Sequence, residues 1–106
     1  MKKHVMKKWV AALRSGKYKQ TRGRLHNKRG GGYCCLGVLC EISGMEFNPN
    51  DGMIPYSVEN WSGLRTRKGS CADTNLRGES LASYNDHSKL SFKAIANIIE
   101  KHWKNL

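Results

Sequence analysis

Residues 33–40, YCCLGVLC, constrain the fold most strongly because they form a continuous apolar run in a chain of only 106 residues. A chain of this length supports one small domain with one modest core, and this run must lie within that core. Together with the residues up to Gly44, it predicts a short buried helix that Gly44 ends, with a buried strand as the alternative. Gly37 costs about 1 kcal/mol inside a helix. We therefore expect it to allow close approach of another backbone segment.

Amphipathic helices are predicted near both ends of the chain. Residues 4–15 have an apolar face at helical spacing, and Gly16 is placed to end that helix. Ser91 is the expected N-cap of the second helix. The apolar face of the second helix consists of Phe92, Ile95, Ala96, Ile99 and Trp103. No internal repeat or linker is visible, so residues 1–106 are predicted to form a single domain.

The middle of the chain predicts small, irregular elements. Residues 17–32 form a basic, glycine-rich loop or hairpin in which the three glycines at 30–32 supply a turn. Met45 and Phe47 suggest a brief strand, ended by a turn-rich segment. Ser57 is the expected N-cap of a short helix that stops at Gly63.

Further along, residues 65–79 predict a polar loop and residues 80–86 a short turn. The predicted fold class is α+β and mostly helical. In this fold the N- and C-terminal amphipathic helices pack on a short cysteine-rich buried helix, with minor β-hairpin pieces.

Positive charge is concentrated in the first part of the chain. Residues 1–40 contain eleven Lys and Arg residues and no Asp or Glu, whereas residues 41–106 contain eight of each sign. The net charge of +11 therefore arises entirely before residue 41. Such a field favours an anionic partner, and phosphate is the most common anionic group in a cytosol. The alternative is a solubilising surface, which would usually mix charges of both signs.

The cysteines allow three interpretations. Adjacent Cys34 and Cys35, and the spacing from Cys35 to Cys40, do not fit a tetrahedral zinc site, so no metal site is predicted. A catalytic thiolate near a helix N-terminus and several cations would have a lowered pKa. The third interpretation is that these thiols fill the core as small apolar groups, with Cys34 the more exposed of the adjacent pair. No cofactor is predicted.

Candidate ligand-binding residues come from the basic segment and from a second cluster. Tyr18 can stack on a base, and the glycines before the helix can hold phosphate, although a plain turn explains them equally well. Residues 85–87 have ligand-like side chains, and a capping turn is the alternative there. The complete predicted set is Lys17, Tyr18, Lys19, Arg22, Arg24, Lys28, Arg29, Tyr33, Asn85, Asp86 and His87.

The sequence resembles a family of small proteins from tailed-phage genomes. The resemblance rests on WVxALRSGxYxQ (9–20), YCCLGVLC (33–40), PxSVxxWxGL (55–64), LAxxND (81–86) and SFxxIAxxIE (91–100). It implies a phage setting rather than a particular reaction. A small accessory protein of this kind would act by binding host nucleic-acid machinery, a defence protein or a nucleotide signal.

We therefore expect a phage accessory protein that binds a phosphate-bearing ligand, either nucleic acid or a nucleotide signal, and that counteracts host defence rather than acting as an enzyme. A protein–protein inhibitor or adaptor of a host protein is the alternative, and a cysteine-dependent enzyme is the third hypothesis. No stretch is apolar enough to span a membrane and no export signal is visible, so the expected location is the host cytoplasm. A homodimer would enlarge the small core.

Overall fold

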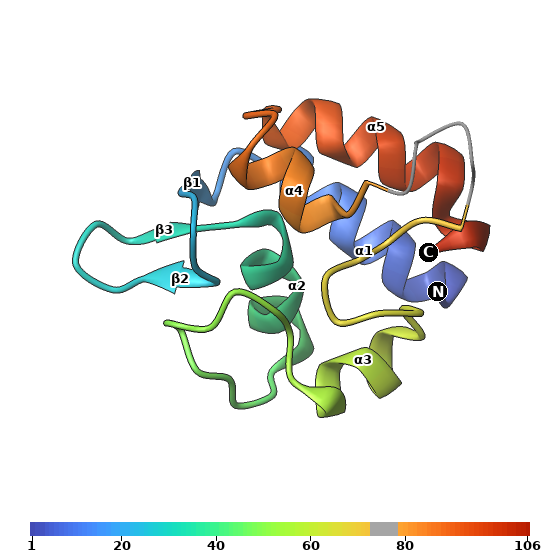
Figure 1. Ribbon diagram of the computed structural model, residues 1–106, viewed down its shortest axis with the longest axis horizontal. Coiled ribbons are helices and arrows are strands. Elements are labelled where there is room, and N and C mark those ends of the chain that lie inside the picture. The colour runs from blue at the N-terminus through green and yellow to red at the C-terminus, as the bar shows by residue number, and fades with distance from the viewer. Residues whose placement is uncertain (73–78) are drawn as a thin grey trace.

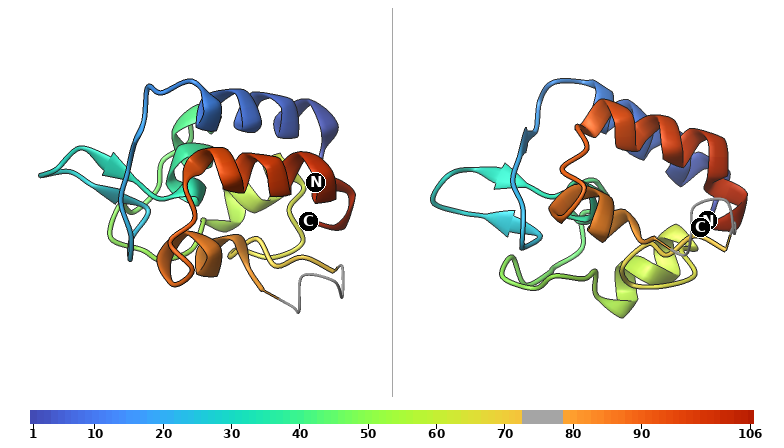
Figure 2. Two further views of the ribbon diagram at one scale, coloured as in Figure 1. Left: turned by 90° about the horizontal axis from the view of Figure 1, so that it is seen from above. Right: turned by 45° about the horizontal axis from the view of Figure 1, so that its top comes forward.

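Two long helices, α1 (Lys3–Arg14) and α5 (Phe92–His102), lie side by side and run antiparallel in the computed structural model (Figure 1, Figure 2). The structure describes residues 1–72 and 79–106. Both helices bury most of the apolar faces that their spacing predicts, and Ser91 caps α5 by accepting a hydrogen bond from the Ala94 N–H at 3.2 Å. Trp103, expected on the α5 face, lies beyond the end of α5 and is half-buried. A short 3₁₀-helix, η2 (Trp103–Asn105), follows α5.

Helix α2 (Cys35–Ser43) packs beneath α1 as the buried centre of the fold. Every residue from 35 to 40 is buried, and Gly44 ends the helix with a left-handed φ of 71°. The Trp9 indole N–H donates to the Cys35 carbonyl at 2.9 Å, which joins the two helices. The buried helix predicted from the apolar run is therefore confirmed, and the strand alternative is wrong.

Two short helices complete the helical part, and each departs from the sequence expectation. Helix α3 (Tyr56–Ser62) begins after Pro55 rather than after Ser57, so the N-cap prediction is wrong. Pro55 serves as the N-cap because its extended backbone lets its carbonyl accept the N–H groups of Val58 and Glu59. Helix α4 (Leu81–Asp86) replaces the expected turn, and the Ser80 hydroxyl accepts a hydrogen bond from the Ser83 N–H at 3.1 Å.

The basic segment folds as a small three-stranded sheet with the order β1-β3-β2. Strand β1 (Lys19–Gln20) runs parallel to β3 (Gly32–Tyr33), and β2 (His26–Asn27) runs antiparallel to β3. Between β2 and β3, the turn at 28–31 closes the hairpin as the glycines predict, with Gly31 at a φ of 74°. The hairpin projects from one end of the molecule (Figure 1).

The strand expected at Met45 and Phe47 is absent from the described residues, since residues 45–48 are irregular. The chain instead turns through residues 48–51, where the Pro49 and Asp51 carbonyls accept hydrogen bonds from β2 and from the residue before it. Residues 65–72 of the expected polar loop are also irregular, and residues 73–78 of that loop lie outside the described residues. No helix in the described ranges is both long and apolar enough to cross a membrane.

Backbone contact between Leu25 and Gly37 joins the basic segment to α2. A Cβ atom at Gly37 would collide with the Leu25 carbonyl group. That carbonyl accepts the Cys34 N–H at 3.0 Å, and the Leu25 side chain is fully buried. The expectation that Gly37 permits close backbone approach is confirmed.

Replacing Gly37 with Ala should destabilise the fold, because the added methyl group must displace the Leu25 backbone. We expect the free energy of unfolding, measured by chemical denaturation, to fall by at least about 2 kcal/mol. Gly52→Ala is the matched control, since nothing lies within 4 Å of a Cβ atom there. Its unfolding free energy should change by less than about 1 kcal/mol. Equal losses in both variants would contradict the contact.

Candidate functional site

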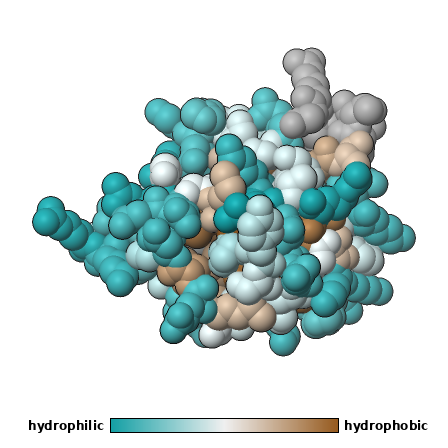
Figure 3. All heavy atoms as spheres, turned by 60° about the horizontal axis from the view of Figure 1, so that its bottom comes forward, coloured by the Kyte–Doolittle hydropathy of each residue, from teal (hydrophilic) through white to brown (hydrophobic). Residues whose placement is uncertain are grey.

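Six predicted cationic residues lie exposed on the segment that forms the small sheet: Lys17, Lys19, Arg22, Arg24, Lys28 and Arg29. Within residues 1–72 and 79–106, none of them has an ion-pair partner, and the single salt bridge joins Arg14 to Glu100 at 3.0 Å. Figure 3 shows hydrophilic side chains covering the projecting end of the molecule, with more hydrophobic residues at its base. This end therefore presents positive charge that forms no ion pair with a carboxylate of the described residues.

Three of these cations share one hollow of about 440 Å³, which we name the basic hollow. Its lining consists of Arg24, Asn27, Lys28, Arg29, Asn48, Pro49 and Asn50. The Arg24 guanidinium donates to the Asn50 amide oxygen at 3.2 Å, which holds one cation at the wall. Apart from Pro49, the remaining lining groups are amides and cations, so the basic hollow suits an anion with several acceptor oxygens.

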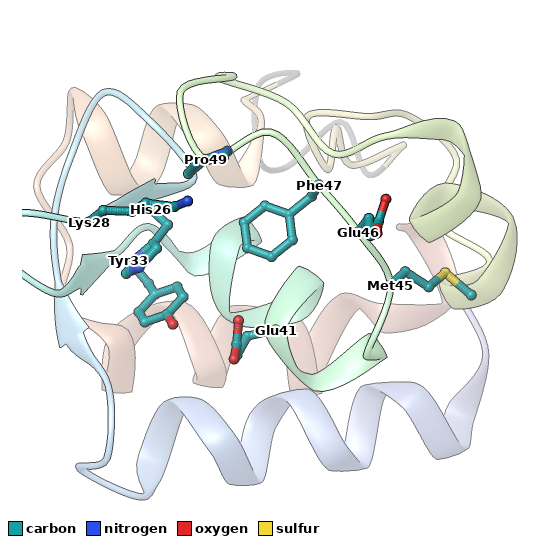
Figure 4. Close-up of a pocket in the computed structure, with 8 residues that line it drawn as sticks. All are labelled: His26, Lys28, Tyr33, Glu41, Met45, Glu46, Phe47 and Pro49. Carbon is teal, nitrogen blue, oxygen red and sulfur yellow. The ribbon is translucent and has the colours of Figure 1, made fainter.

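A second concavity of about 510 Å³ adjoins the basic hollow, and we name it the aromatic groove (Figure 4). It is lined by His26, Lys28, Tyr33, Glu41, Met45, Glu46, Phe47 and Pro49. Lys28 and Pro49 line both concavities. The aromatic groove thus combines rings with two carboxylates, immediately beside a cationic surface.

The Tyr33 ring is held by two neighbours. His26 stacks on it with the ring centroids 4.0 Å apart and 17° between the planes, and Tyr18 meets it edge to face at 5.4 Å. The Nδ1 atom of His26 lies 2.8 Å from the Gly32 carbonyl oxygen. Because a carbonyl can only accept, Nδ1 donates, which orients the histidine ring. Tyr18 is therefore a packing partner of Tyr33 and is half-buried rather than free for stacking.

The Tyr33 hydroxyl points toward the Glu41 carboxylate (Figure 4). Burial, reinforced by the negative charge and hydrogen bonding of Glu41, raises the pKa of Tyr33 above its usual value. The phenol therefore stays protonated at neutral pH and remains a hydrogen-bond donor in the groove wall.

Residues 85–87 are the second predicted cluster, and Asn85 lies within a network of hydrogen bonds inside the protein. Asn85 is fully buried, and its amide oxygen accepts from the Gln20 side chain at 2.8 Å and from the Cys35 N–H at 3.2 Å. Its amide nitrogen donates to the Thr21 carbonyl and to the Asp86 carboxylate, both at 2.9 Å. All its hydrogen-bonding groups are thus used inside the protein.

The two neighbours of Asn85 also lie apart from the basic hollow. Asp86 accepts the Gly23 N–H at 3.0 Å, which connects α4 to the basic segment. His87 is exposed, and with Asp86 it lines a separate hollow of about 330 Å³ that includes Ser83 and Lys68. The structure therefore does not bring residues 85–87 together with the basic hollow.

The thiols of the apolar run lie in the core. Cys35 and Cys40 are fully buried, and Cys34 is only 5% exposed. Burial raises the pKa of Cys34 to about 11 and that of Cys40 to about 12, and raises the pKa of Cys35 well above its ordinary value. Desolvation by burial is the largest influence on all three thiols, so the lowered pKa that the catalytic-thiolate alternative requires is not found.

The Cys34 sulfur instead caps α2 by accepting a hydrogen bond from the Gly37 N–H at 3.3 Å. No group of three or more His, Cys, Asp or Glu side chains suited to a metal occurs among the residues that the structure describes. The arrangement therefore supports the packing interpretation of these cysteines.

Sequence reasoning missed the residues that complete the aromatic groove. Phe47 was expected in a strand, and Glu41 follows the cysteine-rich run with no sign of a site. Two of the three amides of the basic hollow, Asn48 and Asn50, occur in the turn-rich segment around Pro49, which predicts a turn but not a binding surface. These positions come together through hydrogen bonds from residues 24–26 to the 48–51 turn.

Comparison with known proteins adds one match. Residues 1–48 match the model of a family described as a domain of unknown function (DUF8296). No curated protein and no solved structure matches the chain significantly. The matched part includes α1, the small sheet and α2, and so contains all six exposed cations and most of the aromatic groove.

Replacing Asn85 with Ala should destabilise the protein, because the Cys35 N–H and the Thr21 carbonyl would lose their buried partner. We expect a loss of at least about 2 kcal/mol in unfolding free energy by chemical denaturation. Asn60→Ala, at an exposed position on α3, should change it by less than about 0.5 kcal/mol. A wild-type stability for the Asn85 variant would exclude the structural role.

Alkylation should distinguish buried thiols from a reactive nucleophile. At pH 8 a thiol with a pKa of about 11 is ionised in about one molecule in a thousand. Iodoacetamide should therefore leave Cys34, Cys35 and Cys40 unmodified in the folded protein, as read by peptide mass spectrometry, and should modify all three in denaturant. Rapid alkylation of Cys34 in the native state would contradict this.

Proposed function

We propose that the protein binds nucleic acid through the exposed cations of residues 17–29. The observation that supports this most strongly is that none of these six side chains has a carboxylate partner among the described residues. Unpaired surface cations on one projecting end create a local positive potential that attracts phosphates and releases their counterions on binding.

The distribution of the cations favours a polymer over a single nucleotide. Lys28, Arg29 and Arg24 line the basic hollow, whereas Lys17, Lys19 and Arg22 lie outside it on the same segment. A cationic surface that extends beyond one hollow suits a ligand with several phosphates. A nucleotide signal is a smaller ligand that carries the same phosphate groups. Competition by mononucleotides for oligonucleotide binding distinguishes a nucleotide site from a nucleic-acid site.

The resemblance to small tailed-phage proteins supplies the setting of the proposal. In that setting the protein is a non-enzymatic accessory factor that acts in the host cytoplasm, and its binding counteracts host defence. Cys35 and Cys40 on α2, and Cys34 at its N-cap, are all buried. This burial supports a binding function rather than a reaction at a cysteine. The rival is a protein–protein inhibitor whose basic surface docks on an acidic host protein.

Removing two hairpin charges should weaken nucleic-acid binding. Lys28 and Arg29 are exposed, and neither side chain makes a hydrogen bond within the described part of the chain, so Lys28→Gln with Arg29→Gln should leave the fold intact. We expect the slope of log affinity against log salt, measured by fluorescence anisotropy with an oligonucleotide, to become shallower by about 1 to 2.

The control removes the same charge elsewhere, by Lys93→Gln with Lys101→Gln on the exposed side of α5. This variant should keep most of the wild-type slope. An affinity that does not fall as salt rises, or equal effects of the two double variants, would overturn the proposal. If the protein does not bind the oligonucleotide but captures a host protein even after nuclease treatment, the protein–protein inhibitor would be favoured.

A further inference from the structure

The aromatic groove and the basic hollow differ in chemistry although they share a wall. The basic hollow is lined by cations, amides and a proline, whereas the groove adds Glu41 and Glu46 to its rings. The two carboxylates repel phosphate from the groove, and the three cations attract it to the hollow. A ligand that fits both must carry a flat, uncharged part next to an anionic part.

We propose that the aromatic groove receives one unpaired base of single-stranded nucleic acid while the adjoining phosphate lies in the basic hollow. This inference rests on the proposed function and specifies which form of nucleic acid the surface selects. A base inside a duplex cannot enter, because its faces are stacked and its edge is paired.

Phe47 is the stacking platform. Its ring occupies the middle of the groove between Tyr33 and Glu46 (Figure 4), and it is half-buried. No ring contact is found for Phe47 in the ranges that the structure describes, whereas Tyr33 is already stacked by His26 and met by Tyr18. Phe47 is thus held in place with ring surface available to a base.

Glu41 supplies the selectivity among bases. Its carboxylate lies at the edge of the groove beside the Tyr33 hydroxyl (Figure 4). A carboxylate accepts hydrogen bonds from the exocyclic amino groups of cytosine, adenine and guanine, whereas thymine and uracil offer only the ring N3–H. The groove should therefore prefer amino-bearing bases.

The experiment measures anisotropy with oligo-dC, oligo-dT and a duplex of the same length. Wild-type protein should bind oligo-dC at least about fivefold more tightly than oligo-dT. Phe47→Leu keeps an apolar side chain of similar size against the core, and it should weaken oligo-dC binding by at least about fivefold. Its duplex binding should stay within about twofold of wild type, because the phosphate contacts are unchanged.

Three further variants control the result. Phe47→Trp restores a ring and should restore oligo-dC binding, and Glu41→Met should reduce the preference of oligo-dC over oligo-dT. Tyr56→Leu removes an exposed ring, 68% accessible on α3 and outside the groove, and should have no effect on binding. Circular dichroism and thermal melting confirm that each variant is folded.

The outcomes separate this inference from the proposed function. The base site would be overturned if all strands bind in a salt-dependent way and Phe47→Leu does not change their affinities. It would also be overturned if the duplex binds more tightly than oligo-dC. Either result would leave nucleic-acid binding in place. No binding of any strand by the wild-type protein would overturn both.

Discussion

The close approach of the Leu25 backbone to Gly37 is the contact on which the rest of the structure depends. It brings the middle of the basic segment onto the buried helix, where the Leu25 carbonyl accepts the Cys34 N–H and the Leu25 side chain enters the core. On one side of this point the chain continues into β2, whose His26 lines the aromatic groove. On the other side is Arg24, which lines the basic hollow. Both concavities are therefore positioned by one contact that only glycine permits.

A second set of contacts explains how a sheet with such short strands stays in place. Strands of two residues cannot hold a basic segment by their own pairing. Tertiary hydrogen bonds do so instead, because Asn85 binds Gln20 and Thr21, and Asp86 binds the Gly23 N–H. Helix α4, although only six residues long, thus fixes β1 and the loop after it. Residues that resemble ligands in the sequence serve to orient the surface that carries the charges.

The elements that local physics dominates were predictable, and those that depend on distant partners were not. Helices α1 and α5 follow directly from a strong 3.6-residue period, and Gly37 could be interpreted from its cost inside a helix. The sequence leaves the reactivity of Cys34 open, because it shows nearby cations but not how deeply the thiol is buried. Phe47 was placed in a strand because no local pattern indicates that the 48–51 turn binds β2. Asn85 contacts partners 50 to 65 residues away, which one sequence cannot indicate.

The hairpin cations form no ion pair among the described residues, and this affects the stability of the folded state itself. Like charges held on one end of a small protein repel one another, and dissolved ions weaken that repulsion over a distance of about 10 Å at 0.1 M. Those same ions compete with the surface for phosphate. The folded state should therefore be most stable at high salt, where the proposed binding of a polyanion is weakest. A polyanion bound as we propose would replace salt in reducing the repulsion between these charges.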